Sequence, residues 1–161
     1  TGKEFQLSHC GAHTMDIMRM ESGFLHWGHD ISPEENQFQA KLNFTISFKK
    51  NFDFIGKKKL LEIKNQKLDR RIIMLLLKNN DPGNPLLLHE EPIYLNNTII
   101  GKTTSGNYSF NYNKNISFGY IESDLKDEDL HEKNLYIEIE KLKYPAELLL
   151  KPLKQNNYKN I

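Results

Sequence analysis

The sequence predicts an α+β fold, in which a mixed first part is followed by a small antiparallel β-barrel or sandwich. Apolar residues recur at helical spacing within residues 8–22 and 54–66. From residue 70 onward, short apolar or alternating segments are separated by turn residues, a pattern typical of antiparallel β-structure. We therefore expect two domains, residues 1–67 and residues 68–161.

The first expected helix spans residues 8–22. Ser8 can cap its start, and Gly23 occupies the position of a left-handed C-terminal cap. Arg19 falls inside the apolar stripe of this helix, which consists of Ala12, Met15, Met18 and Ser22.

A capped turn, a strand and a second helix are expected next. Ser32 and Glu35 have the spacing of a capping box. Residues 38–50 form a candidate strand, because apolar side chains alternate through Leu42, Phe44, Ile46 and Phe48. Residues 54–66 follow as a helix with a strongly basic outer face, which we interpret as solvated.

The second part begins with the apolar run at residues 70–78 and a strong turn cluster at residues 79–85. Asn96 and Asn97 form a two-residue hairpin signal between two strand candidates. The further candidate strands are residues 93–95, 98–104, 116–121, 135–140 and 144–150.

Composition excludes several classes of protein. The 161 residues include 22 basic and 21 acidic side chains, so no broad basic field favours nucleic acid as a partner. No apolar run approaches the roughly 20 residues that span a bilayer, so we expect no membrane partner. The single cysteine, Cys10, excludes an internal disulfide and fits a reducing compartment, so we expect a cytoplasmic protein.

A metal site is the first chemical interpretation to weigh. His9 and His13 are spaced to share one helix face, and His26, His29 and Asp30 lie close in sequence. However, the sequence contains no specific metal signature, and histidines at this spacing also arise on polar helix surfaces. We favour helix surface and turn packing. Cys10 has no convincing general base nearby in sequence, so nucleophilic catalysis finds little support.

Arg19 is the residue that needs a physical explanation. A guanidinium on an apolar stripe must find an anion or several carbonyl groups, because burying it unpaired costs several kcal/mol. One interpretation is a structural salt bridge to Glu21, to Asp30 or to a residue of a neighbouring element. The other is a ligand for an anionic or carbonyl-bearing substrate. Arg70 and Arg71 raise the same question.

Several segments, taken in order, resemble the C-terminal part of the folate-dependent aminomethyltransferase family. They are "MRMESGFLHWGHDISPEENQFQAKL", "FIGKKKLL", "RRIIMLLL", "EPIYLNNTIIGKTTSGNYS", "NISFGYI" and "YPAELLLKPL". That family includes the aminomethyltransferase of the glycine cleavage system and the folate-binding halves of dimethylglycine and sarcosine dehydrogenases. The pattern R-x-E-x-G-F-x-x-W-G-x-D resembles the dehydrogenase branch most.

The resemblance implies that residues 1–67 are the end of a mixed α/β folate-binding domain and that residues 68–161 are a C-terminal β-barrel. Family members bind tetrahydrofolate and pass to it a one-carbon unit from a methylated amine or an aminomethyl carrier. Their catalytic aspartate lies further towards the N-terminus. We therefore expect a fragment that packs against a missing N-terminal half and is inactive alone, with FAD confined to a missing upstream domain.

The family's folate contacts carry over to five positions. The helix motif places Arg19, and an aromatic residue of the following segment matches Phe44. Two further contacts are the basic pair that opens the barrel and an aromatic residue near the C-terminus, which match Arg70, Arg71 and Tyr158. Lys41 stands where the family usually has glycine, a departure that we expect to alter the local turn.

Two alternatives to a fragment of such an aminomethyltransferase stay open. The chain would then be a non-catalytic binding module derived from the family, or part of a folate-dependent demethylase of another methylated substrate. The sequence assigns no role to His29.

Overall fold

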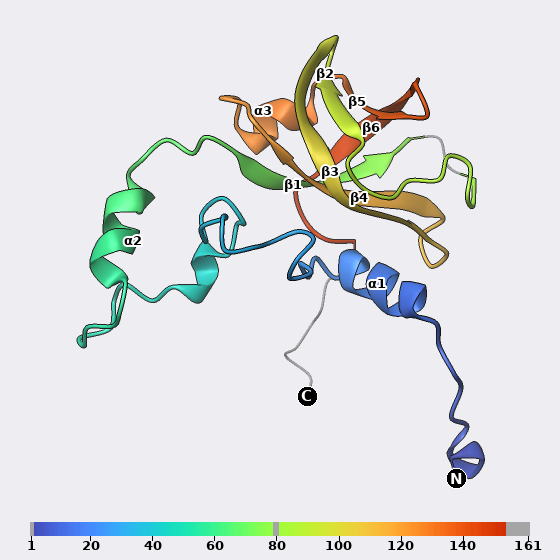
Figure 1. Ribbon diagram of the computed structural model, residues 1–161, viewed down its shortest axis with the longest axis horizontal. Coiled ribbons are helices and arrows are strands. Elements are labelled where there is room, and N and C mark those ends of the chain that lie inside the picture. The colour runs from blue at the N-terminus through green and yellow to red at the C-terminus, as the bar shows by residue number, and fades with distance from the viewer. Residues whose placement is uncertain (1, 79–80, 154–161) are drawn as a thin grey trace.

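A closed six-stranded antiparallel barrel forms the centre of the computed structural model, which describes residues 2–78 and 81–153 (Figure 1). The strand order around the barrel is β1-β4-β3-β2-β5-β6. The strands are β1 (Arg71–Leu77), β2 (Pro92–Leu95), β3 (Thr98–Ser109), β4 (Lys114–Ile121), β5 (Leu135–Ile139) and β6 (Leu142–Leu149). The predicted small antiparallel barrel is confirmed, and the sandwich alternative is not.

Strand β1 explains why its sequence is an unbroken apolar run. Its side chains alternate between two separate clusters of buried residues. Ile73, Leu75 and Leu77 join the barrel core together with β5 and β6. Ile72, Met74 and Leu76 instead face a second cluster that includes Met20 of the first helix. Because both faces of β1 are covered, neither face needs polar residues.

Helix α1 (Ala12–Glu21) starts later than residue 8, but it ends as predicted. Gly23 adopts a left-handed φ of 79°. Its N–H donates to the carbonyl of Met20 at 3.0 Å, and the N–H of Phe24 donates to the carbonyl of Arg19 at 2.9 Å. These two bonds form a Schellman cap. A Cβ at Gly23 would approach Cγ of Pro152 to 2.5 Å, so glycine is also the residue that fits there.

The predicted strand at residues 38–50 is wrong. This segment contains turns and the short 3-10 helix η2 (Asn43–Thr45). The physical reason is that a strand needs a neighbour, and in the described residues the barrel strands pair only with one another. The second helix is confirmed as α2 (Lys57–Lys64), whereas η1 (Lys3–Phe5) and α3 (Asp127–His131) were not predicted.

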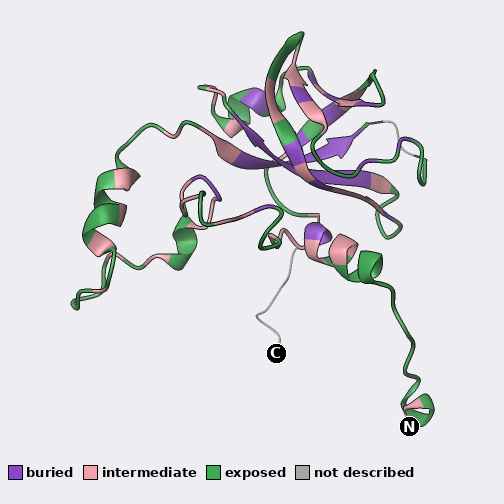
Figure 2. Cartoon of the chain, viewed as in Figure 1, coloured by how far each residue is buried: buried purple, intermediate pink, exposed green. Residues whose placement is uncertain are grey.

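Residues 43–67, here called the arm, project away from the barrel (Figure 1). No residue of the arm is buried, and Figure 2 shows α2 in the exposed and intermediate colours only. The arm contrasts with the barrel strands, most of whose side chains are buried or half-buried. Within the described ranges, no helix is long and apolar enough to cross a membrane.

Asp127 ties the start of the barrel to α3 and to the turn that precedes the arm. Arg71 donates through Nε to its carboxylate at 2.9 Å, and Lys41 forms a second ion pair with it. Arg71 also donates to the carbonyls of Ser123 and Leu125. Lys41 has a left-handed φ of 55°. Its side chain has an anionic partner in Asp127, and the alteration of the turn expected from this departure stays a prediction.

The charge of Asp127 makes a pH-dependent contribution to stability. Burial alone would raise the pKa of Asp127, but hydrogen bonds and charge from Lys41 and Arg71 outweigh it and hold the pKa below its ordinary value of 3.8. A depressed pKa stabilises the fold above the unfolded-state pKa, and this stabilisation is lost as the pH falls through the folded-state pKa.

We predict that Asp127→Asn lowers the free energy of unfolding at pH 7 by about 2 kcal/mol, because hydrogen bonds to charged groups contribute about that much. Below about pH 4, where the unfolded-state carboxyl becomes protonated, the difference from the native protein should shrink. Urea unfolding measured between pH 3 and 7 tests this. The control is Glu128→Gln, which alters an exposed neighbouring acid. Equal pH profiles for the two variants would contradict the prediction.

Candidate functional site

A groove of about 810 Å³ lies between α1, the turn after it, the segment before β2, and strand β3. This volume is within the range of small-molecule sites. Its apolar lining includes Met15, Leu25, Leu86 and Leu88. Its polar lining includes His13, Asp16, Arg19, His26 and His29.

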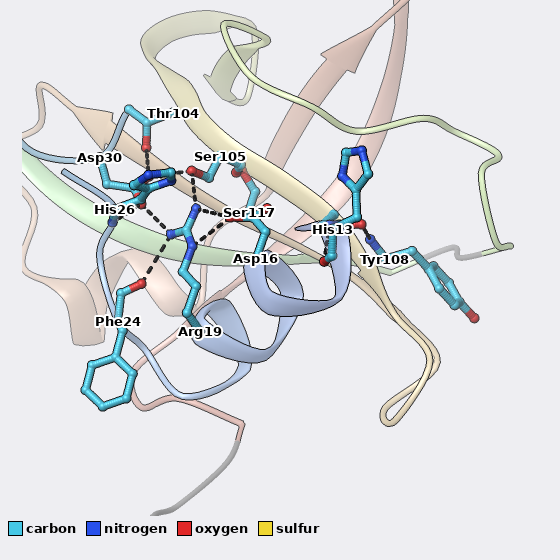
Figure 3. Close-up of polar contacts among 11 residues, drawn as sticks. His13, Asp16, Arg19, Phe24, His26, Asp30, Thr104, Ser105, Tyr108 and Ser117 are labelled. Carbon is cyan, nitrogen blue, oxygen red and sulfur yellow. Dashed lines mark hydrogen bonds and ion pairs between the residues drawn. The ribbon is translucent and has the colours of Figure 1, made fainter. Parts of the chain in front are cut away.

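Arg19 lies at the inner wall of this groove, where all of its guanidinium nitrogens have protein partners (Figure 3). Nε donates to Asp16 at 2.8 Å, and Nη2 donates to the hydroxyl of Ser105 at 2.8 Å. Nη1 pairs with Asp30 and donates to the carbonyl of Phe24 at 3.2 Å. The structural salt bridge considered from the sequence is therefore present, with Asp16 and Asp30 as its partners.

Asp30 is the other centre of this network, and only 1% of its surface is exposed. Besides Arg19, it accepts hydrogen bonds from the backbone N–H of His26 at 2.9 Å and from two hydroxyls of β3. Those hydroxyls belong to Thr104 and Ser105, at 2.6 and 2.7 Å. A buried carboxylate with four donors, one of them cationic, joins α1, the turn and the barrel.

Glu21 forms a second buried link between α1 and the barrel. Its carboxylate accepts hydrogen bonds from the hydroxyl of Ser109 at 2.5 Å and from the side-chain amide of Asn111 at 3.1 and 3.2 Å. From the sequence, Glu21 was expected only as a partner for Arg19, a role that the structure gives to Asp16 and Asp30. This role could have been predicted from the sequence. An acidic side chain in the last turn of a helix interacts unfavourably with the helix dipole, so a compensating partner is expected.

The predicted folate contacts do not converge on one cavity. Of the four in the described residues, Arg19 alone lines the groove. Phe44 lies in η2 with 80% of its surface exposed. Arg70 pairs with Glu35 at 2.8 Å, and Arg71 is held by Asp127. Tyr158 lies outside the described residues.

Glu35 also explains the turn around Ser32. It accepts hydrogen bonds from the backbone N–H and the hydroxyl of Ser32 at 2.8 and 2.6 Å. The predicted capped turn is confirmed, although no helix follows it.

Four histidines line the groove, namely His13, His26, His29 and His89. The rings of His26 and His29 lie 4.6 Å apart between centroids, and His13 lines the groove from α1. In the parts of the chain that the structure describes, no three His, Cys, Asp or Glu side chains are grouped to hold a metal ion. His29, which had no assigned role, is thus a polar contact available to a ligand in the groove.

The groove has the kinds of side chain that a flat ring such as that of tetrahydrofolate needs. A flat ring needs apolar walls, which Met15, Leu25 and Leu86 supply, and polar groups at the edge, which His13 and His29 supply. Arg19 has no spare donor for an anion, because Asp16, Phe24, Asp30 and Ser105 accept its N–H groups.

We predict that Arg19→Ala lowers the free energy of unfolding by about 3–5 kcal/mol, because Asp30 keeps a buried charge without its cation. The double variant Arg19→Ala/Asp30→Ala should lose less than the sum of the two single losses. Denaturant unfolding of the four proteins measures this coupling. A loss below about 1 kcal/mol for Arg19→Ala would mean that the pair is not structural.

Comparison with known proteins gives consistent results for both parts of the chain. A family model described as the glycine cleavage T-protein C-terminal barrel domain matches residues 70–154, and one described as the GCVT N-terminal domain matches residues 1–50. The fold resembles that of the glycine cleavage system aminomethyltransferase T from Bartonella henselae, with a TM-score of 0.73 at 21% identity. That match covers 86% of this chain and 37% of the other.

The curated proteins that are similar in sequence include a dehydrogenase and an oxidase. Mitochondrial dimethylglycine dehydrogenase of Homo sapiens is 33% identical over 94% of this chain and 17% of its own length. The 4-methylaminobutanoate oxidase (formaldehyde-forming) of Paenarthrobacter nicotinovorans is 35% identical over 76% of this chain and 15% of its own length. The chain thus spans less than a fifth of either relative. Because the barrel-domain model covers more than half of the chain, the chain belongs to the glycine cleavage T-protein family.

Proposed function

We propose that this chain is the C-terminal part of a tetrahydrofolate-dependent aminomethyltransferase-like enzyme, of the glycine cleavage or the dimethylglycine or sarcosine dehydrogenase type. The observation that carries the proposal is the collinear match of two successive family domains, at residues 1–50 and 70–154. Tetrahydrofolate, when bound, would accept the one-carbon unit from a methylated amine or an aminomethyl carrier. A flavin, if used, would belong to a further domain of the whole protein.

The chain's own residues would contribute binding and positioning. The groove beside α1 offers an apolar surface that can exclude water from one side of a flat ligand. The Arg19–Asp30 pair holds that wall to β3, so that His13 and His29 face the groove from fixed backbone positions. Preorganisation of this kind lowers the entropy cost of binding. We do not assign a catalytic residue to this chain.

The domain boundaries, the other folate contacts and the cellular location are part of the same proposal. Residues 1–67 would complete a folate-binding domain whose other half precedes this chain, and residues 68–161 would form the barrel domain that packs against it. Phe44, Arg70, Arg71 and Tyr158 would contact the folate only within that larger assembly. We propose a cytoplasmic location, although the human relative is named as mitochondrial.

A second candidate is a folate-dependent demethylase of another methylated amine. The similarity to 4-methylaminobutanoate oxidase favours it, because that name describes a methylated amine other than dimethylglycine. The third candidate, a non-catalytic module, is favoured by the saturation of Arg19 and Arg71 with protein partners. The three candidates are separated by measuring the formation of methylene-tetrahydrofolate by the whole protein with different methylated amines. The first two candidates differ in the amine that gives product, and the non-catalytic module gives none.

We predict that the whole protein binds tetrahydrofolate in isothermal titration calorimetry. Met15→Glu should weaken binding at least tenfold, because a charge would enter the apolar wall of the groove. The matched control is Leu142→Glu, an exposed leucine at the start of β6 that does not line the groove. Absence of binding to the native protein would refute the folate proposal, and equal binding by the two variants would refute the groove.

A further inference from the structure

Four of the six histidines of the chain line the groove beside α1. They are His13 on α1, His26 and His29 in the turn after α1, and His89 in the segment before β2. All four residues are exposed, and among the described residues no hydrogen bond or ion pair occupies any of the four rings. The ring nitrogens are therefore available to a ligand.

His26 and His29, here called the histidine pair, stand on a turn that its own backbone holds in place. The N–H groups of His29 and Asp30 donate to the carbonyl of His26 at 3.2 and 2.8 Å, and the N–H of His26 donates to the carboxylate of Asp30 at 2.9 Å. The two rings lie 4.6 Å apart between centroids. Because a carboxylate has two oxygens, one carboxylate can accept a hydrogen bond from each ring.

The charge of the groove wall depends on the protonation of its histidines. Arg19 is positive, and its partners Asp16 and Asp30 are negative, which leaves a net charge of −1. Tyr108, the other ionisable side chain that the described residues contribute to the lining, adds no charge between pH 6 and 8. Histidine is the side chain that gains a positive charge as the pH falls through this range. The groove wall therefore changes from net negative to net positive.

The acidic residues next to His89 do not alter the surroundings of the histidine pair. Glu90 and Glu91 follow His89 in the chain, but neither lines the groove. Glu90 pairs with Lys102, and Glu91 accepts a hydrogen bond from the backbone N–H of Leu88 at 2.9 Å. The histidine pair has no such acidic neighbours beyond the network of the arginine, so it is the better place for an anion.

We propose that the histidine pair, when protonated, binds the carboxylate of a ligand in the groove, so that anionic ligands bind more tightly as the pH falls. This inference deepens the proposed function and rests on its claim that the groove holds a ligand. Arg19 cannot take this role, because its donors are used within the protein. Two imidazolium rings this close repel one another, and a carboxylate offsets that repulsion. Binding should therefore take up protons.

The carboxylate has two candidate sources, which share this chemistry. Tetrahydrofolate carries carboxylates at its glutamate end, and an amino-acid substrate such as dimethylglycine carries one as well. In either case the apolar walls would hold the rest of the molecule, and the histidine pair would fix its charged end.

Isothermal titration of the whole protein with benzoate and with benzamide tests the inference, because the two probes have the same shape and differ in charge. Benzoate should bind at least tenfold more tightly at pH 6 than at pH 8, which corresponds to an average uptake of about half a proton per ligand. Benzamide should bind equally at both pH values. Displacement of benzoate at pH 6 by tetrahydrofolate or by dimethylglycine identifies the source of the carboxylate.

The variant His26→Gln/His29→Gln should bind benzoate with the same affinity at pH 6 and pH 8, and it should bind benzamide as the native protein does. The matched control is His9→Gln, an exposed histidine that does not line the groove, and it should keep the native pH dependence. A native pH dependence in the double variant would assign the proton to another group and overturn the inference.

The remaining outcomes also decide the inference. Absence of benzoate binding at pH 6, or equal binding at both pH values, overturns it. Proton-coupled benzoate binding by a whole protein that fails to bind tetrahydrofolate supports the histidine site and refutes the folate proposal. A whole protein that binds tetrahydrofolate but binds no benzoate refutes the histidine site alone.

Discussion

The buried carboxylate of Asp30 is the constraint on which the rest of the arrangement depends. An anion at this depth is tolerated only because a guanidinium and three further donors surround it. Those donors come from α1, from the turn after it and from β3. The charge therefore dictates where the helix must lie on the barrel, and the groove exists because the helix is held there.

The barrel could be predicted because its signals are local. Turn residues separate its strands, and apolar and polar residues alternate along β5. The apolar run of β1 is short and rich in branched residues, which is typical of a buried strand. The end of α1 could also be predicted, since a glycine at a helix end indicates a left-handed cap. By contrast, α3 is only five residues long and highly acidic, and such a helix leaves little periodic signal.

The candidate site was less predictable than the fold because its geometry is non-local. The sequence predicts that Arg19 needs an anionic partner, and Asp30 was one candidate. Thr104 and Ser105, which complete the network, lie more than 70 residues away along the chain, so no local pattern indicates them. The folate contacts inferred from resemblance describe an assembly larger than these residues. Phe44 illustrates this, since its alternating segment predicts a strand, whereas in the described residues it lies in a 3-10 helix outside the barrel.

The contact between Gly23 and Pro152 has a consequence for synthesis. It joins the end of the first long helix to the segment that follows the last strand. During vectorial synthesis, α1 leaves the ribosome long before the residues that will cover it. The apolar face carrying Met20 therefore stays uncovered until β1 and β4 have been made, and it is completed only by the segment after β6, an interval in which a chaperone can bind it.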